Sequence, residues 1–316
     1  MPGTRTSRTA VEIASQPECW RRAARLLPSR AAALPRRGER VAVVGCGTSW
    51  FVAQAYAALR ESGGHGETDA FAASEFPAGR TYDRVVAVTR SGTTTEVLDL
   101  LGRLRGTVPT GAITADPGTP VAGAADDVAV LDFADEESVV QTRFATTVLA
   151  LLRAHLEAEG ALPPGVRPLA AAVRDADSAV ASPLPAAVRT AEQFTFLGAG
   201  WCHGLALEAA LKMREAAGAW TEAYPAMEYR HGPVSVTGPG RVVWILGTPP
   251  PGLVDEAARA GGTVVADSRA GEGGIDPLAD LVRAQRLAVA VAEARGCDPD
   301  RPAHLTRSVV LDGPRA

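Results

Sequence analysis

Lysine is nearly absent from this sequence. Of its 32 lysine and arginine residues, only Lys212 is a lysine. A bias this strong toward arginine indicates that position 212 needs a compact ammonium group, or an amine that can lose its proton. Glu208 and Glu215 lie four residues before and three residues after Lys212, so all three are expected on one face of a helix. The alternative is an ordinary ion pair on a helix surface, worth about 0.3–0.5 kcal/mol.

Cysteine pairs, metal-ligand spacings and long apolar runs are also missing. The 4 cysteines and 5 histidines are scattered, which argues against a disulfide framework and a structural zinc site, and we expect no cofactor. No apolar run reaches the ~18 residues of a membrane-spanning helix. The polar start Met1–Arg8 lacks the apolar stretch of a signal peptide. We therefore expect a cytoplasmic protein without a membrane partner.

The net charge gives no sign of a polyanionic partner. It is −4 at pH 7, and no run of basic residues stands out. Proteins that bind nucleic acids usually carry a basic patch, so we expect no nucleic-acid partner. Any anionic ligand has to be held by local groups.

One strand–turn–helix pattern occurs twice. The apolar run 40–46 leads through a glycine turn into a helix-like stretch at 49–61, and 194–197 leads in the same way into 203–217. Gly45 and Gly47 in the first copy match Gly198 and Gly200 in the second. Further strands are expected at 84–88, 111–114, 128–132, 241–246 and 263–266, with helices at 94–105 and near 253–260. The pattern predicts an α/β fold with two tandem, doubly wound parallel sheets.

The domain boundaries follow from this duplication. We predict an N-terminal helical segment over 1–35 and a first domain over 36–158. A proline-rich connecting segment with one helix is expected over 159–190. The second domain is then expected over 191–296 and a C-terminal tail over 297–316.

A loop rich in hydroxyl groups follows the predicted strand 84–88. It contains Thr89, Arg90, Ser91, Gly92, Thr93, Thr94 and Thr95. The first turn of a helix has unpaired N–H groups at the positive end of its dipole, so we expect a phosphate monoester to bind here. The alternative is a helix N-cap, which needs one hydroxyl group rather than five. A dinucleotide site is disfavoured, because Trp50 stands where its glycine fingerprint needs glycine or alanine.

These motifs together resemble the sugar isomerase (SIS) family of phosphosugar-binding proteins. The chain is most similar to the branch of the isomerase half of glucosamine-6-phosphate synthase and the amino-sugar-phosphate deaminases. The resemblance rests on Gly45-Cys46-Gly47-Thr48-Ser49, Thr89-Arg90-Ser91-Gly92-Thr93-Thr94, Glu137-Ser138-Val139-Val140-Gln141-Thr142, Leu207 to Glu215, and Glu228-Tyr229-Arg230-His231-Gly232-Pro233. It covers nearly the whole chain and implies SIS-type, flavodoxin-like αβα sandwiches and a homodimer.

The resemblance also implies roles for individual residues. Glu215 would be the base at C2 of the sugar, and Lys212 would support it. His231 would help to open the pyranose ring, in its own subunit or in its neighbour's. The expected ligands of a small phosphosugar are Cys46, Gly47, Thr48, Ser49, Thr89, Arg90, Ser91, Thr93, Thr94, Ser138, Val139 and Gln141.

One departure from the family pattern leaves the reaction open. The relatives carry a catalytic lysine in their tail, and Arg307 stands in its place. A guanidinium group cannot form a Schiff base, so Arg307 would be a fixed cation. Aldose–ketose isomerisation or deamination of glucosamine-6-phosphate, and dehydration of an N-acetylated sugar phosphate, remain equal possibilities. A sensor that binds the sugar phosphate without turnover is the alternative of another class.

Overall fold

Two parallel β-sheets form the framework of the protein, in a computed structural model that describes residues 6–269 and 273–311. The chain divides into two units. Unit 1 comprises Met1–Arg21, Glu136–Arg143 and Pro164–Leu305, and unit 2 comprises Arg22–Asp135, Phe144–Pro163 and Thr306–Ala316. Residues 1–5 and 312–316 of the predicted terminal segments lie outside the described residues.

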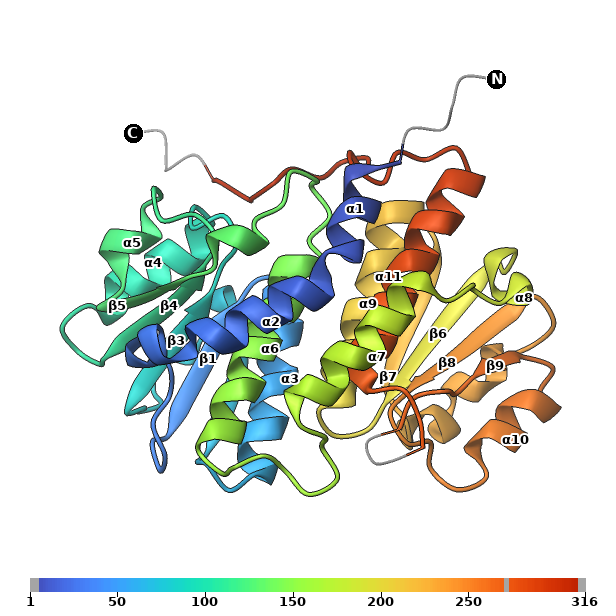
Figure 1. Ribbon diagram of the computed structural model, residues 1–316, viewed down its shortest axis with the longest axis horizontal. Helices are drawn as coiled ribbons and strands as arrows, with labels where there is room; N and C mark the ends of the chain where they lie inside the picture. The colour runs from blue at the N-terminus through green and yellow to red at the C-terminus, as the bar shows by residue number, and fades with distance from the viewer. Residues whose placement is uncertain (1–5, 270–272, 312–316) are drawn as a thin grey trace. The chain divides into compact units, whose positions relative to one another are not determined.

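Unit 2 contains a five-stranded sheet in the order β2–β1–β3–β4–β5. Its elements are β1 (Val41–Gly45), α3 (Thr48–Ser62), β2 (Thr68–Ala72), β3 (Arg84–Val88), α4 (Thr95–Leu104), β4 (Thr110–Thr114), α5 (Val121–Ala124), β5 (Asp127–Val130) and α6 (Arg143–Ala158). Every residue of β1 and β3 is buried, as expected for valine-rich parallel strands covered on both faces. Val97 and Leu100 of α4 and Val121 of α5 pack on one face, and α3 packs on β1 and β2 (Figure 1).

Unit 1 contains a four-stranded sheet in the order β7–β6–β8–β9. Its elements are α1 (Arg8–Ala14), α7 (Leu169–Ala181), α8 (Ala186–Arg189), β6 (Gln193–Gly198), α9 (Cys202–Ala217), β7 (Trp220–Pro225), the 3₁₀ helices η5 (Glu228–His231) and η6 (Pro233–Val236), β8 (Arg241–Leu246), α10 (Leu253–Arg259), β9 (Thr263–Val265) and α11 (Pro277–Ala294). The helix α2 (Gln16–Leu26) runs from residues of unit 1 into residues of unit 2. Leu253 of α10 and Tyr229 of η5 pack on the sheet face formed by Leu197, Val243 and Ile245.

The helices α9 and α11 lie along the other face of this sheet (Figure 1). Trp244 of β8 donates from its indole nitrogen to the fully buried carboxylate of Asp280 on α11, at 3.0 Å. Arg283 donates to the same carboxylate at 2.9 Å. These bonds satisfy the polar groups that α11 buries against the sheet.

The two units repeat the same strand order, which supports the predicted duplication. In each, the first strand is followed by a helix, lies between the second and third strands, and ends at a glycine. A Cβ atom on Gly45 would lie 2.6 Å from the Cβ of Ser49, and one on Gly198 would lie 2.2 Å from the carbonyl oxygen of Cys202. Both glycines are therefore required by the first turn of the helix that follows.

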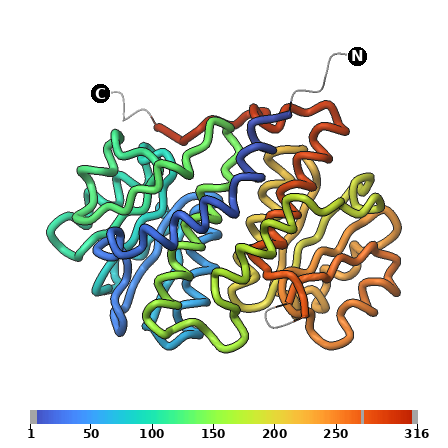
Figure 2. Tube along the Cα trace, viewed as in Figure 1, coloured from blue at the N-terminus to red at the C-terminus, as the bar shows by residue number. Residues whose placement is uncertain are grey.

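At the opposite ends of the described chain, α1 and the segment after α11 lie side by side (Figure 2). The backbone N–H groups of Arg8 and Thr9 donate to the carboxylate of Asp300 at 2.9 and 2.8 Å. The Thr9 hydroxyl donates to it as well, at 2.7 Å. Burial acts to raise the pKa of Asp300, but these hydrogen bonds outweigh it, so the pKa is lowered. The carboxylate thus satisfies the unpaired N–H groups at the start of α1.

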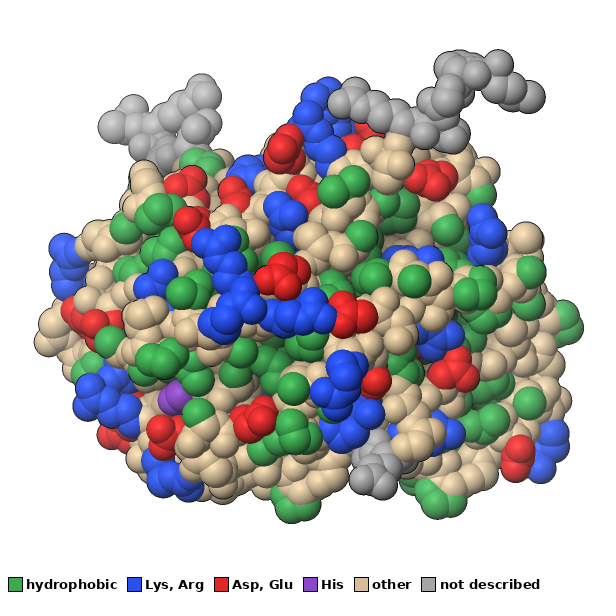
Figure 3. All heavy atoms as spheres, in the orientation of Figure 1, with side chains coloured by type: hydrophobic (Ala, Val, Ile, Leu, Met, Phe, Trp, Pro, Cys, Tyr) green, Lys and Arg blue, Asp and Glu red, His purple; other side chains and the backbone are tan. Residues whose placement is uncertain are grey.

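Side chains of both charges are mixed on the surface. On the face drawn in Figure 3, arginine side chains alternate with aspartate and glutamate side chains. Arg21, for example, pairs with Glu18 at 3.5 Å and also with Asp177. Within residues 6–269 and 273–311, no helix has both the length and the apolar content needed to cross a membrane.

Unit 2 buries a charged side chain at the end of α3. The guanidinium of Arg60 donates to the hydroxyl of Thr68 at 2.8 Å and to the carbonyl oxygens of Arg36 and Glu39 at 2.7 and 3.0 Å. Its Nε donates to Nδ1 of His65 at 3.1 Å, and both side chains are fully buried. Burial, and then the charge of Arg60, lower the pKa of His65 to about 4. His65 is therefore neutral in the folded protein near neutral pH.

This arrangement predicts a loss of stability in acid. His65 binds its proton near pH 6.5 when the chain is unfolded and near pH 4 when it is folded. As the pH falls from about 6.5 to 4, the unfolded state gains the proton first, and the free energy of unfolding falls by up to about 1.4 kcal/mol per pH unit. His65→Gln still accepts from Arg60 but does not titrate, so its stability should fall less steeply over this interval. Urea denaturation across the interval measures both slopes.

Equal slopes for the parent and His65→Gln would contradict the assignment of the acid sensitivity to His65.

Candidate functional site

The two predicted phosphate loops of unit 2 follow neighbouring strands. β1 and β3 pair in parallel, while the chain reaches β2 on the far side of β1 before it returns to β3. Such a reversal of strand order is where open α/β sheets bind ligands, outside the carboxyl ends of the strands. Cys46, Gly47, Thr48 and Ser49 follow β1, and Thr89 to Thr94 follow β3. The structure thus brings these two sets together at one edge of the sheet, with the amino ends of α3 and α4.

Several hydroxyl groups of the loop after β3 are not used to cap the helix. Thr94 occupies the N-cap position of α4, but its side chain makes no capping hydrogen bond. The hydroxyl oxygen of Thr89 is buried and has no hydrogen-bond partner among the described residues. The Ser91 hydroxyl accepts from the backbone N–H of Thr93 at 3.3 Å. The alternative interpretation as a simple N-cap therefore does not account for this loop.

The loop after β3 also needs a glycine. Gly92 has a φ of +63°, and a Cβ atom there would lie 2.0 Å from the hydroxyl oxygen of Thr119. A larger residue would be strained by its backbone and would collide with Thr119. The backbone of the loop can therefore turn tightly before α4 begins.

The C-terminal segment 306–311 lies against this loop. The hydroxyl groups of Thr93 and Ser308 are 2.9 Å apart, and the backbone N–H of Thr95 donates to the carbonyl oxygen of Val309 at 3.2 Å. Arg90 donates to the carbonyl oxygen of Arg307 at 3.0 Å. Two of the predicted ligands, Thr93 and Arg90, thus already have partners in the tail.

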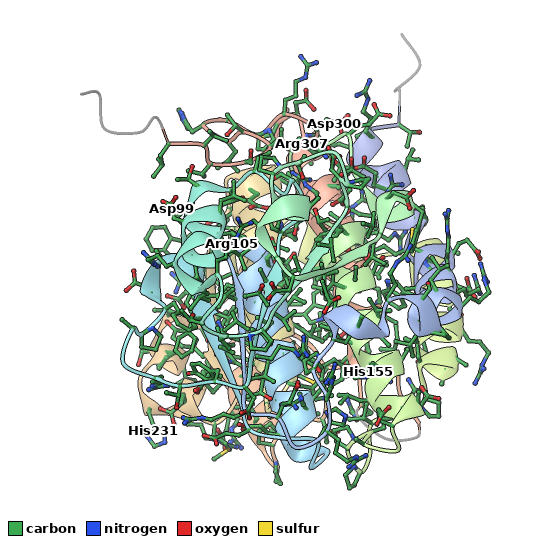
Figure 4. The ribbon with its side chains drawn as sticks, turned by 90° about the vertical axis from the view of Figure 1, so that its left-hand side faces the viewer. Asp99, Arg105, His155, His231, Asp300 and Arg307 are labelled. Atoms are coloured by element: carbon green, nitrogen blue, oxygen red, sulfur yellow. The ribbon has the colours of Figure 1, made fainter. Side chains whose placement is uncertain are left out.

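Arg307 itself pairs with a carboxylate in unit 2. Its Nη2 donates to both carboxylate oxygens of Asp135, at 2.6 and 2.8 Å. Both side chains are partly exposed. The predicted cation of the tail is therefore held in place by a carboxylate. Figure 4 places Arg307 at the end of unit 2 away from His155, which contacts His65.

In unit 1, α9 places Lys212 between Glu208 and Glu215. The ammonium nitrogen lies 3.5 Å from the Glu208 carboxylate and in direct contact with that of Glu215. Lys212 and Glu208 are each 1% exposed, whereas the Glu215 side chain is 20% exposed. The alternative of a surface ion pair is therefore wrong. Of the two carboxylates in this group, only that of Glu215 can be reached by solvent or a ligand.

The electrostatics of this group keep the lysine charged. Burial acts to lower the pKa of Lys212, but the attraction of Glu208 and Glu215 outweighs it, so the pKa is raised. Of the two roles expected from the sequence, a compact ammonium fits and an amine that loses its proton does not. Lys212 can balance and orient a carboxylate, but it cannot act as a base near neutral pH.

The segment 136–143 lies beside this ion group in unit 1. Val140 and Thr142 line a narrow crevice together with Lys212 of α9 and Gln285 of α11. Ser138 is buried, and its hydroxyl donates to Glu12 and to the carbonyl oxygen of Val140, the latter at 3.0 Å. The Oε1 of Gln141 is buried without a hydrogen-bond partner among the described residues. Of the predicted ligands in this segment, Gln141 is thus the one whose polar group is left for a substrate.

His231 lies far from Glu215 within unit 1. Glu215 is in the last turn of α9, which leads to the amino end of β7, whereas His231 follows the carboxyl end of β7. A strand of six residues is about 20 Å long. His231 is exposed, and Figure 4 places it at the end of unit 1 opposite Asp300. The structure therefore does not bring this pair together within one chain.

In unit 1, the corresponding loops after β6 and β8 pack closely together. A Cβ atom on Gly247, after β8, would lie 2.7 Å from the sulfur of Cys202, after β6. The two loops are in contact where those of unit 2 carry hydroxyl groups. The loop 248–251, with the sequence Thr-Pro-Pro-Pro, thus offers one hydroxyl group beside this packed turn.

The sequence analysis missed two buried carboxylates, Glu12 and Glu136. Glu136 accepts from the backbone N–H and hydroxyl of Thr142 at 2.5 and 2.7 Å. Glu12 lies on the buried face of α1 with Thr9 and Ile13. The sequence signal that could have revealed Glu12 is a glutamate among the apolar residues of one helix face. No group of three or more His, Cys, Asp or Glu side chains in the described part of the chain could hold a metal ion.

Comparisons with known proteins bear on the fold and the family of the chain. No protein-family model matches the chain. Glutamine–fructose-6-phosphate aminotransferase (isomerizing) of Methanothermobacter thermautotrophicus is 29% identical over 308 residues, which cover 87% of this chain and 52% of that protein. The chain thus spans about half the length of the curated relatives that it matches.

Solved structures extend the similarity to the whole fold. Glucosamine-6-phosphate deaminase from Thermotoga maritima matches with a TM-score of 0.79 and 27% identity, over 96% of this chain and 100% of that one. The C-terminal domain of glucosamine-fructose-6-phosphate aminotransferase from Francisella tularensis matches with a TM-score of 0.73 and 20% identity, over 96% of this chain and 100% of that one, and supports the fold alone. The chain is therefore a homologue of the isomerase domain of these aminotransferases, which confirms its resemblance to the sugar isomerase family.

Proposed function

We propose that the protein is an enzyme that removes the C2 proton of an open-chain amino-sugar 6-phosphate, with glucosamine-6-phosphate as its substrate. The observation that carries the proposal is the ion group on α9. A partly exposed carboxylate, Glu215, contacts the buried and charged Lys212. Similarity to a glucosamine-6-phosphate deaminase over the full length of that structure supports the substrate class.

The proposed reaction is isomerisation with loss of ammonia. Glu215 takes the proton from C2, the electron pair of the C–H bond forms a C1–C2 double bond, and the C1 oxygen gains a proton. A proton is then delivered to C1, and the double bond moves to C2 and nitrogen. Water adds to C2 and ammonia leaves, which gives the ketose phosphate. A well-placed general base contributes about 10² to 10⁴ in rate.

The loops of unit 2 would hold the phosphoryl group. The buried hydroxyl of Thr89 has no hydrogen-bond partner among the described residues, the hydroxyl of Thr94 makes no capping hydrogen bond, and Ser49 is the second residue of α3. Hydroxyl donors and helix amino ends are a suitable environment for a dianion. Each contact of this kind contributes about 0.3–1 kcal/mol when exposed and up to about 2 kcal/mol when partly buried.

His231 would act in the site of a second copy of the chain. Within one chain, the length of β7 separates it from Glu215, and its side chain is exposed. An imidazole that opens the sugar ring has to reach the ring oxygen within hydrogen-bond distance. A homodimer that supplies His231 from the neighbouring subunit meets this requirement.

Dehydration of N-acetylglucosamine-6-phosphate is the second candidate reaction. Arg307 occupies the position of the family's tail lysine and cannot form a covalent imine. This favours a reaction that needs no imine between enzyme and substrate. After Glu215 takes the C2 proton, the electron pair forms a C2–C3 double bond and the C3 hydroxyl leaves as water with a proton. The acetylated nitrogen stays on the sugar.

Glu215→Gln is expected to lower turnover at least about 10²-fold while affinity for the sugar phosphate stays within about twofold, because only the base is lost. Turnover is followed as ammonia and ketose from glucosamine-6-phosphate, and as loss of one water from N-acetylglucosamine-6-phosphate. Exchange of the C2 hydrogen in heavy water measures the first step, and calorimetry measures binding. Glu228→Gln, at an exposed position in η5, is the control.

The products distinguish the candidate functions. Ammonia with ketose supports deamination, and an unsaturated sugar supports dehydration. Binding without exchange of the C2 hydrogen would identify a sensor and contradict the enzyme proposal. Full turnover by Glu215→Gln would remove Glu215 from its role.

Lys212→Met is expected to destabilise unit 1 by about 3–5 kcal/mol, because it leaves the buried carboxylate of Glu208 without its cation. Adding Glu208→Gln should restore most of this stability, but not activity, since Glu215 still lacks its partner. Thermal unfolding and C2 exchange measure the two effects separately. Recovery of exchange in the double variant would show that Lys212 serves stability alone.

Mixing Glu215→Gln with His231→Asn tests the shared site. Each variant should be inactive alone. After the two are unfolded and refolded together, mixed dimers carry one site with both side chains, so about a quarter of the parent activity should return. The controls are each variant refolded alone. No recovery in mixed dimers, verified by mass spectrometry, would show that Glu215 and His231 do not meet across subunits.

A further inference from the structure

The buried carboxylate of Glu12 joins two separate parts of unit 1, the helix α1 and the segment 136–143. It lies on α1, and its side chain is 4% exposed. Its Oε1 accepts from the backbone N–H groups of Glu137 at 2.6 Å and Ser138 at 3.3 Å. Its Oε2 accepts from the hydroxyl of Ser138. Three donors of the segment 136–143 thus converge on one charged group of the N-terminal helix.

The same segment is held from two further sides. The backbone N–H of Val139 donates to the carbonyl oxygen of Asp300 at 3.1 Å, and the carboxylate of Asp300 holds the first turn of α1. Glu136 holds the other end of the segment, because its Oε1 accepts from the backbone N–H of Arg143 at 2.8 Å. Hydrogen bonds to charged groups are shorter and about twice as strong as neutral ones. The turn 137–139 is therefore fixed by the carboxylate of Glu12 and the backbone carbonyl of Asp300 rather than by a strand or a helix.

What this turn fixes is the position of Gln141. Its neighbours Val140 and Thr142 line a crevice with Lys212 that is too narrow for a water molecule, and Gln141 is not among the residues that line it. The amide oxygen of Gln141 is buried and has no partner among the described residues. A buried acceptor of this kind costs free energy unless a ligand or water satisfies it. A hydroxyl or amino group of the sugar is a donor that fits.

We propose that Glu12 is a positioning residue, which fixes the turn 137–139 and thereby places Gln141 to bind the sugar part of the substrate. The proposal rests on the proposed function, because it takes a phosphosugar as the ligand. It assigns to the N-terminal helix a role in sugar binding that is independent of phosphate binding, since the phosphate loops belong to unit 2.

Glu12→Gln provides the test. The amide keeps the size of the side chain but replaces one acceptor oxygen with an NH₂ group, which cannot accept from Ser138 or Glu137. We expect the KM for glucosamine-6-phosphate, or for the acetylated sugar if that is the one turned over, to rise about tenfold. The inhibition constant of inorganic phosphate, which reports on unit 2 alone, should stay within about twofold of the parent value.

Two control variants separate positioning from loosening of α1. Arg8→Gln removes an exposed ion pair between the same two segments, Arg8 and Glu137, and should change neither constant. Ile13→Val removes one buried methyl group from the same helix and lowers the melting temperature, while the three hydrogen bonds of Glu12 stay in place. Its KM should equal that of the parent. If Glu12→Gln does not fold, Ser138→Ala removes one of the three donors and should raise the KM about threefold.

The outcomes are distinct. A rise in the KM together with an unchanged inhibition constant for phosphate supports the positioning role. An unchanged KM for Glu12→Gln overturns the positioning role. Changes in the KM and in the inhibition constant that are the same for Glu12→Gln and Ile13→Val also overturn it. Neither outcome affects the proposed function. A parent protein that binds inorganic phosphate but neither sugar phosphate overturns the proposed function and this inference with it.

Discussion

The buried ammonium of Lys212 is the interaction on which the candidate site depends. α9 ends at Gly218, whose left-handed conformation closes the helix just after Glu215. A carboxylate in the last turn of a helix faces the negative end of the dipole, which is unfavourable by about 0.3–1 kcal/mol. Lys212 offsets this and also neutralises Glu208, which has no access to solvent. Only a helix that continues unbroken from Glu208 to Glu215 can hold one cation between both carboxylates.

Much of the fold could be read from the sequence, because the strands of a doubly covered parallel sheet are short apolar runs. The strands 84–88 and 241–246 have the bounds that the sequence predicted. β7 was missed because it is an edge strand with partly exposed residues, including Glu222, and so lacks an apolar run. α6 was also missed. Its sequence has a polar face, but nearly all of its residues are buried, including Thr146, Thr147 and Arg153 on that face, so the fold covers a helix that the pattern would leave half-exposed.

The candidate site could be predicted only in part, since spacing along a helix is local and contacts between segments are not. The helical spacing of Glu208, Lys212 and Glu215 was sufficient to place them together, and the structure confirms this contact. Nothing local connects Glu12 with Ser138 or Asp135 with Arg307, because 126 and 172 residues separate these partners. The role of Ser138 shows the consequence. The family resemblance indicated a ligand of the sugar phosphate, whereas its hydroxyl is bonded to Glu12 within the protein.

The contact between the loop after β3 and the end of the chain has a consequence for the order in which unit 2 is completed. The hydroxyl of Thr95 accepts from the backbone N–H of Leu311, which is 216 residues further along the sequence. During synthesis, the sheet and α4 emerge from the ribosome long before these last partners exist. The loop is therefore made early and acquires these hydrogen bonds only after residues 309–311 have been made.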